Sequence, residues 1–238
     1  ILAKQMYSSN IMHNNISSQG GSTAIVLTDG SCGNEISQNY LFNNGYKHWG
    51  GIILSYGSND NILADNIIDG FQGGIGIMTT ENAIKGNTIK NSKENGIGLM
   101  YATGNIIREN QIENNGCGLS LQYENNDNII YHNNFINNTI HAQVGTGTNQ
   151  WDDGWKGNYW DDYEEQYPDA RKTLRGTYTI SYELDDENTD RYPLTQEYSS
   201  SAKQDLNKII SNFFSILQNY FSKTTNIIAK IIYHITSE

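Results

Sequence analysis

The sequence lacks three features that would place a chain of 238 residues in a familiar functional class. It has only two cysteines, Cys32 and Cys117, without C-x-x-C spacing, and this excludes a disulfide framework. It has no run of 18 apolar residues, so no segment spans a membrane unaided. Its formal net charge is -11, whereas a nucleic-acid partner calls for a basic surface.

What the sequence does contain is an internal repeat. The pattern apolar-x-x-Asn-x-apolar recurs six times, and its central asparagine is present in every copy: Asn14, Asn39, Asn66, Asn87, Asn110 and Asn133. A second apolar track, often preceded by glycine, keeps register with the first and begins with Ile25 and Leu27. Two tracks that hold register over six copies predict a repeat architecture.

The residues between the tracks decide which repeat architecture this is. Each copy holds two short stretches of period-2 alternation separated by Asn, Gly and Ser turns, without helical periodicity. Units stacked about 4.8 Å apart bury isoleucine on isoleucine in continuous columns. A leucine-rich horseshoe has a similar repeat length, but its L-x-x-L-x-L pattern and its helical half are missing. The sequence therefore predicts an all-β, right-handed parallel β-helix of six coils over residues 1-148.

The six asparagines predict a ladder at a turn of this β-helix. Asparagine tolerates left-handed backbone geometry, and its amide both donates and accepts, so stacked copies can bond to one another. At the start of the chain, Ile1 and Ala3 fall where the second strand of a preceding coil would lie. We therefore expect further coils upstream.

The composition changes sharply after the sixth copy. Residues 149-198 hold 13 of the 26 acids of the chain and three of its four tryptophans. A solenoid needs an atypical terminal unit to cover its last apolar coil. We therefore expect Trp151, Trp160 and Leu194 to fold over that coil as an aromatic, acidic cap.

Residues 199-238 form a third region. Their apolar residues follow i, i+3, i+4, i+7 spacing, which predicts an amphipathic helix or helical hairpin over residues 203-236. Since the isoleucine columns already fill the solenoid core, we expect this helix to dock on the body of the chain or on a partner. A membrane surface is the alternative.

Three stretches near the end of the repeat resemble a known family. They are Ile-Tyr-His-Asn-Asn-Phe-Ile-Asn-Asn-Thr at 130-139, Gly-Asn-Tyr-Trp-Asp-Asp-Tyr at 157-163, and Asp190-x-Tyr192-Pro193-Leu194. They look like the NosD-like β-helix family, which belongs to the CASH grouping of carbohydrate-binding and sugar-hydrolase β-helices and is frequent in archaeal surface proteins. The resemblance covers residues 1-198 and implies an extracellular or cell-surface location and a glycan or polysaccharide partner.

The resemblance also raises the question of whether the chain binds calcium or copper. Family members often carry an Asp/Gly-rich loop suited to calcium between the cap motifs, but residues 164-172 of this chain read Glu-Glu-Gln-Tyr-Pro-Asp-Ala-Arg-Lys, so we expect no cofactor and leave only calcium open. The family name implies copper, which is bound by clustered His, Cys and Met. The last coil offers only His132 and His141, and Cys32 and Cys117 lie several coils apart. We therefore predict no metal site and keep copper handling as an alternative function.

A catalytic alternative rests on the turn position before the ladder asparagine. Asp65 and Glu109 occupy this position two coils apart, at about 10 Å, with only Gly86 between them. Such a separation approaches that of an inverting carboxylate pair. Lys85 and Arg108 lie beside them. These four charged residues are the candidate catalytic set of a polysaccharide lyase or glycoside hydrolase.

Aromatic and acidic residues favour binding over catalysis. Flat rings and hydroxyl acceptors suit sugars, and the candidates are Trp49, Trp155, Tyr159, Asp161, Asp162 and Tyr163. No nucleophile, metal cluster or phosphate loop is recognisable. We therefore expect a surface module that binds carbohydrate or serves as an envelope scaffold, and self-association is the third alternative.

Overall fold

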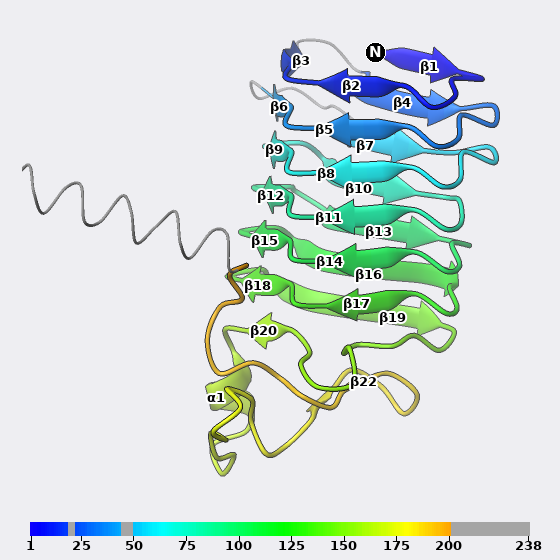
Figure 1. The fold of residues 1–238 in the computed structure, drawn as a ribbon. Coiled ribbons are helices and arrows are strands. Elements are labelled where there is room, and N and C mark those ends of the chain that lie inside the picture. Colours follow the sequence, from blue (N-terminus) through cyan, green and yellow to red (C-terminus); the bar gives the residue numbers. More distant parts are fainter. Residues whose placement is uncertain (19–21, 44–49, 201–238) are drawn as a thin grey trace, which may run out of the picture. The chain divides into compact units, whose positions relative to one another are not determined.

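The computed structural model describes residues 1-18, 22-43 and 50-200, and residues 1-198 form one compact unit. This unit is a right-handed parallel β-helix followed by a cap (Figure 1). The helix predicted over residues 203-236 lies outside the described residues, as does Trp49. Within the described part, no helix is long and apolar enough to cross a membrane.

The strands form three parallel sheets that run along the solenoid. Sheet 1 contains β1 (Leu2–Lys4), β4 (Ile25–Thr28), β7 (Gly50–Leu54), β10 (Gly73–Ile77), β13 (Asn95–Met100), β16 (Cys117–Glu124) and β19 (Ile140–Thr146). Sheet 2 contains β2 (Asn10–Met12), β5 (Glu35–Ser37), β8 (Ile62–Ala64), β11 (Ala83–Lys85), β14 (Ile106–Arg108) and β17 (Ile129–Tyr131). Sheet 3 contains β3 (Asn15–Ser18), β6 (Tyr40–Asn43), β9 (Ile67–Asp69), β12 (Thr88–Lys90), β15 (Gln111–Glu113), β18 (Asn134–Ile136) and β20 (Tyr159–Trp160).

Each coil therefore contributes three strands, whereas the repeat showed two apolar stretches. The stretch around the ladder asparagine is divided, because the chain turns between its two apolar residues. In the third coil, β8 ends at Ala64, Asp65 takes a left-handed conformation with φ of 54°, and β9 begins at Ile67. A strand of three residues directs only one side chain inward, so alternation alone could not reveal the division.

The core consists of apolar columns with one side chain from each coil. In sheet 1, Ile25, Ile52 and Ile75 pair in register and are buried. In sheet 3, the column that contains Ile112 continues through Phe135 to Trp160 of β20. The rings of Phe135 and Trp160 stack with centroids 4.4 Å apart and planes 6° apart. The cap thus extends the core column with a larger ring.

The ladder asparagines bond from coil to coil along the turn between sheets 2 and 3. The Nδ2 atom of each donates to Oδ1 of the next at 2.9 to 3.0 Å, from Asn14 through Asn133 and on to Asn158. The expected left-handed geometry does not fall on the asparagine. It falls on the preceding residue, which has φ between 54° and 67° in every coil: His13, Gln38, Asp65, Gly86, Glu109 and His132. The asparagine amide therefore satisfies the backbone of a turn that its neighbour makes.

A second ladder runs along the turn between sheets 1 and 2. Its members donate from Nδ2 to the next Oδ1 at 2.9 to 3.5 Å: Asn34, Asn61, Asn82, Asn105, Asn128, Asn149 and Asn188. Five of them stand five residues before an asparagine of the first ladder. Apart from Asn105, these asparagines lack the upstream apolar residue of the apolar-x-x-Asn-x-apolar pattern, so the pattern does not include them.

The cap closes the last coil. It contains β20, the short helix α1 (Tyr163–Gln166) and the antiparallel pair β21 (Tyr182–Glu183) and β22 (Thr189–Asp190). Trp151, Trp160 and Leu194 are buried as predicted. Tyr182 stacks on the face of Trp160 at 4.2 Å, with planes 5° apart. The aromatic cap is therefore continuous with the solenoid core.

Candidate functional site

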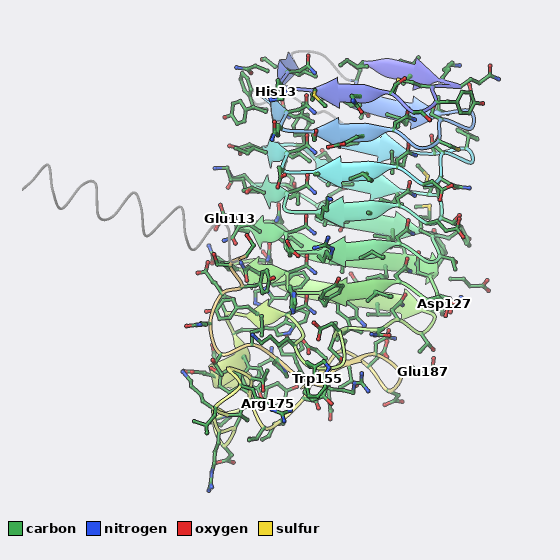
Figure 2. All side chains as sticks on the ribbon, in the orientation of Figure 1. His13, Glu113, Asp127, Trp155, Arg175 and Glu187 are labelled. Atoms are coloured by element: carbon green, nitrogen blue, oxygen red, sulfur yellow. The ribbon has the colours of Figure 1, made fainter. Side chains whose placement is uncertain are left out.

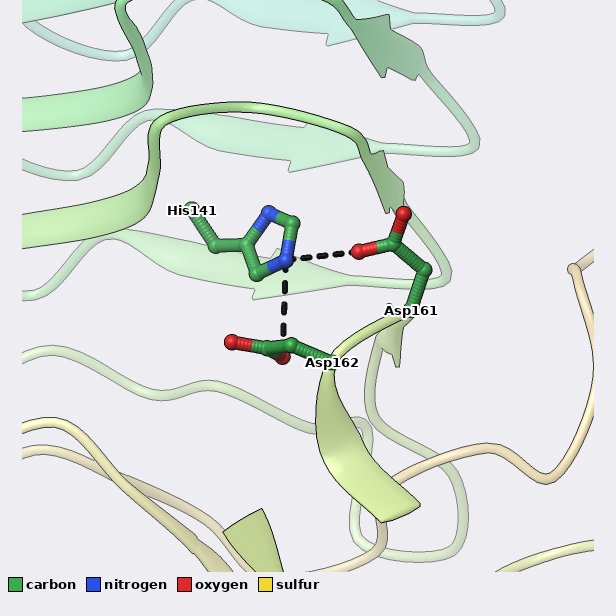
Figure 3. A group of neighbouring side chains, drawn as sticks. All are labelled: His141, Asp161 and Asp162. Carbon is green, nitrogen blue, oxygen red and sulfur yellow. Dashed lines mark ion pairs between the residues drawn. The ribbon is translucent and has the colours of Figure 1, made fainter. Parts of the chain in front are cut away.

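Three ionisable side chains converge where the last coil meets the cap (Figure 3). His141 lies on β19 with 5% of its side chain exposed, while Asp161 and Asp162 follow β20 directly and are 31% and 30% exposed. The Nε2 atom of His141 lies 2.7 Å from Asp161 Oδ1 and 3.4 Å from Asp162 Oδ1. From the sequence both aspartates are predicted to bind sugar hydroxyls; in the structure they face an imidazole.

Each aspartate is held by its other carboxylate oxygen. The backbone N–H of Asn137 donates to Asp161 Oδ2 at 2.7 Å. Gln166 Nε2 and the Tyr182 hydroxyl donate to Asp162 Oδ2 at 2.6 Å and 3.3 Å. The two Oδ1 atoms are therefore left to face the imidazole. Asp162 Oδ1 is buried, and no described residue donates a hydrogen bond to it.

The cluster lines an open, polar cleft of about 560 Å³ between β19 and α1. Glu165 lines the same cleft, which therefore holds three carboxylates and one imidazole among its lining groups. An excess of carboxylates attracts cations and repels anions. The cleft is suited to a cation or to a ligand rich in hydrogen-bond donors.

The second ring nitrogen of His141 also has a neighbour. Asn138 Nδ2 lies 3.4 Å from His141 Nδ1. Asn138 Oδ1 accepts a hydrogen bond from Asn115 at 3.0 Å, and this fixes the amide with its NH₂ group toward the ring. A donor beside Nδ1 favours the tautomer with its proton on Nε2, from which it donates to Asp161.

A second histidine of the same coil pairs with a different aspartate. His132 Nε2 lies 3.3 Å from Asp153 Oδ2, and its ring stacks on Tyr198 with centroids 4.2 Å apart. Burial lowers the pKa of His132, while Asp153 and Glu109 oppose the shift. His132 and His141 therefore have separate carboxylate partners. The pair that the sequence left open for copper does not form one site.

The other predicted binding residues that the structure describes do not line this cleft. Trp155 is 66% exposed on the cap, and the Arg175 guanidinium lies 5.3 Å from the centre of its ring (Figure 2). Tyr163 is buried, its hydroxyl donates to a backbone carbonyl, and it offers no face to a sugar. Tyr159 is half-buried on β20, and its burial raises the pKa of its hydroxyl.

Of the predicted catalytic residues, Asp65 and Glu109 lie in equivalent turns, whereas Lys85 and Arg108 end strands β11 and β14. Asp65 is exposed, and its carboxylate covers Gly86, where an added Cβ would lie 2.4 Å from Asp65 Oδ1. Glu109 forms an ion pair with Arg108 beside it. Lys85 is half-buried on β11. Because Glu109 is ion-paired with Arg108, Asp65 is the one carboxylate of these two turns without an ion pair among the described residues. The arrangement does not resemble an acid–base pair.

Sheet 1 carries a shallow groove of about 170 Å³ on its outer face. Gly76 and Gly98 pair in register and form its floor, because neither has a side chain to fill the space. Ile53, Met78 and Met100 border the floor with apolar atoms. Glycine at two adjacent outward positions thus leaves the backbone of two strands accessible.

Two stacked tyrosines directly follow residues that line this groove. Tyr101 and Tyr123 directly follow the lining residues Met100 and Gln122. Their rings stack with centroids 4.9 Å apart and planes 9° apart, and they are 61% and 54% exposed. Tyr56 occupies the equivalent turn of an earlier coil and is 79% exposed. Tyrosines at or just after the ends of three sheet 1 strands therefore present aromatic faces to solvent.

The position of His141 in the repeat distinguishes it from the equivalent residues of the earlier coils. The position before the second apolar pair is Gly51, Gly74, Gly96 and Gly118 in four coils, and an added Cβ there would lie 2.4 to 2.7 Å from a backbone carbonyl of the next coil. The last coil has His141 at this position. Among the described residues no strand of sheet 1 follows β19, so a side chain fits where four earlier coils have glycine.

The fold and the closed end define the chain as a capped parallel β-helix with a polar cleft at the junction. A family model described as "Periplasmic copper-binding protein (NosD)" matches residues 45–165, just over half of the chain, and the chain belongs to this family. A search of curated proteins found no match. The matched residues include the groove on sheet 1 and the cluster of His141, Asp161 and Asp162.

The family description raises the question of which described residues suit copper. Burial raises the pKa of the Cys117 thiol to about 11, so this residue is a poor thiolate ligand. Met78 and Met100 border the groove on sheet 1, away from any described histidine cluster. Among the described residues, one group of three His, Cys, Asp or Glu side chains converges, and it offers the imidazole of His141 and two carboxylates. This donor set fits a divalent ion such as Cu(II), and it does not fit Cu(I), which selects sulfur.

Proposed function

We propose that this chain is a module of the cell envelope, on the outer side of the membrane, that binds an extended glycan along the groove of sheet 1. One observation carries the proposal: a glycine-floored, apolar-edged groove lies next to an exposed, stacked tyrosine pair, Tyr101 and Tyr123. Sugar rings present flat C–H faces, which pack on aromatic and apolar surfaces, and hydroxyls, which bond to exposed polar groups. The family description as periplasmic supports the location.

The parallel repeat supports a polymeric ligand in particular. Equivalent positions recur at the strand spacing of about 4.8 Å, so the groove runs across successive strands. Its floor crosses β10 and β13, and Gln122 of β16 continues its edge. A repeating surface of this kind matches a repeating ligand better than a single small molecule.

A glycan array followed by calorimetry with the best ligand tests the proposal. Gly98→Leu should fill the groove and weaken binding by about tenfold or more, the loss expected when about 1.4 kcal/mol of contact is removed. An added Cβ at Gly98 has nothing nearer than 3.6 Å, so the variant should fold normally. Tyr101→Ala should also weaken binding, whereas Tyr56→Ala, on the equivalent turn two coils earlier, should not.

The same preparation distinguishes the alternatives. If the array shows no glycan above background, or if Gly98→Leu binds as the wild type does, the groove is not the site. Release of new reducing ends from a bound polysaccharide, lost in Asp65→Asn, would favour the catalytic alternative. Release of reducing ends is not expected, because the carboxylate of Glu109 is already paired with Arg108.

A further inference from the structure

The cluster at the junction of coil and cap is arranged around a single point. Asp161 Oδ1, Asp162 Oδ1 and the imidazole of His141 place their ligand atoms within 4.8 Å of one another (Figure 3). Among the residues that the structure describes, this is the one group of three His, Cys, Asp or Glu side chains that does so. The three come from β19 and from the residues after β20, so the two chain segments are brought together here.

The protein donors leave one carboxylate oxygen unsatisfied. Each Oδ2 is bonded by the surrounding structure, which points each Oδ1 at His141 Nε2. His141 Nε2 can donate only one hydrogen bond there, and Asp161 Oδ1 at 2.7 Å accepts it. Asp162 Oδ1, although it lies 3.4 Å from the same nitrogen, is buried without a donor. A buried acceptor without a partner is unfavourable, and a cation at this point would satisfy both carboxylates.

We propose that His141, Asp161 and Asp162 bind one divalent transition-metal ion, with the imidazole Nε2 and two monodentate carboxylates as its protein ligands. One nitrogen and two oxygen donors suit borderline ions of the Zn(II) and Cu(II) kind better than calcium, which takes oxygen ligands alone. Metal binding at Nε2 requires the imidazole tautomer with its proton on Nδ1, so the ring proton moves from Nε2 to Nδ1 by exchange with solvent. The contact between Asn138 and Nδ1 must then lengthen, and at 3.4 Å it is already at the long limit of a hydrogen bond.

Bound metal would join the last coil to the cap. His141 belongs to the solenoid, while both aspartates belong to the segment that carries Trp160 over the core. A ligand that binds only the folded state raises the unfolding temperature in proportion to its affinity and concentration. The site therefore predicts a thermal shift as well as a binding isotherm, and neither depends on glycan binding.

Calorimetry and thermal unfolding with zinc and copper(II) chloride test this site, with calcium chloride as the comparison. The wild type should bind about one equivalent of zinc or copper(II) and unfold at a higher temperature, and calcium should have little effect. Asp162→Asn keeps the shape of the side chain and should weaken binding by about tenfold or more. His141→Gln should abolish it.

The second histidine pair provides a matched control. His132 contacts one carboxylate, Asp153, so His132→Gln should bind zinc as the wild type does. Circular dichroism of each variant shows whether the β-helix is intact. Absence of stoichiometric binding in the wild type would overturn the proposal, and so would binding that survives His141→Gln or disappears in His132→Gln.

Discussion

The coils and the cap use the same two ladders in different ways. In the coils, each ladder asparagine accepts from the coil before it and donates to the coil after it, so the repeat satisfies itself. Asn87, for example, accepts from Asn66 and donates to Asn110. The cap has no next coil. It must end both ladders with groups that accept without needing a further copy.

Two residues of the cap perform this termination. Asn188 accepts from Asn149 and from the indole N–H of Trp151, and its own NH₂ donates to Asp185. Asp190 accepts from the backbone of Asn158 at 2.7 Å and from the indole of Trp160 at 2.9 Å. A carboxylate only accepts, so it ends a chain of donors.

The coils and the end of the ladders therefore require different side chains. The coils favour asparagine, which is both donor and acceptor, whereas the end of the first ladder favours aspartate. Each terminal acceptor also receives the indole of the tryptophan that covers an apolar column. The cap therefore ends the polar ladders and covers the apolar core with the same residues.

Removal of the ring that covers the core should have the largest effect. Trp160→Ala should lower the free energy of unfolding by about 3–5 kcal/mol, because it leaves a cavity between Phe135 and Tyr182. Urea unfolding followed by circular dichroism measures the loss. Trp155→Ala, on the exposed ring of the same cap, should cost less than about 0.5 kcal/mol. Equal losses in the two variants would show that the cap does not depend on the core column.

Interruption of a ladder within the coils should have the next largest effect. Asn87→Ala leaves the backbone N–H and the side-chain NH₂ of Asn66 without their acceptor, which should cost about 2–4 kcal/mol. Asn10→Ala, at an exposed position on β2, is the control and should be close to neutral. Similar stability of the two variants in urea would contradict the ladder account.

Replacement of the terminal acceptor should have a smaller, pH-dependent effect. Asp190→Asn turns an NH₂ group toward N–H donors and should cost about 1–3 kcal/mol. Burial raises the pKa of Asp190 from its ordinary 3.8 to about 7, although the N–H donors favour the carboxylate. Between these values the folded state holds a proton that the unfolded state has lost, so the contribution of Asp190 to stability declines as pH rises from about 4 to 7.

Unfolding measurements on the wild type and on Asp190→Asn between about pH 4 and pH 7 test the direction of this pH dependence. The difference in stability between wild type and Asp190→Asn should be largest near pH 4 and smaller above about pH 7, because the variant has no titrating group at this position. A difference that is constant with pH, or one that grows as pH rises, would show that the carboxylate is already charged when the protein folds.

The sequence predicted the regular part of the molecule well, for a physical reason. Where similar coils stack, apolar residues lie on apolar residues and Asn lies on Asn. The repeat spacing alone therefore places Ile36 beside Leu63 and Asn39 beside Asn66. The third strand of each coil stayed hidden because a strand of three residues has no period to detect. The second ladder was present at a fixed spacing of five residues and was overlooked.

The candidate sites were less predictable, since they lie where the repeat ends or varies. His141 was detectable as the side chain that replaces a column of glycines. Its proximity to Asp161 and Asp162 was not, because the chain between β19 and β20 has lost the apolar tracks of the repeat. The groove on sheet 1 depends on glycine at Gly76 and Gly98, where neighbouring strands carry Ile53 and Ser120. Only the register showed that these glycines adjoin.

Hydrogen exchange in the Trp160→Ala variant tests the central claim most directly, namely that the cap ends the ladders and thereby holds the coils. Amide protection measured residue by residue should fall most in the last coil, around Asn128 and Asn133. The loss should diminish coil by coil, and residues 10-43 should exchange as in the wild type. An equal loss in all coils, or a loss confined to residues 149-198 with the last coil fully protected, would contradict the account.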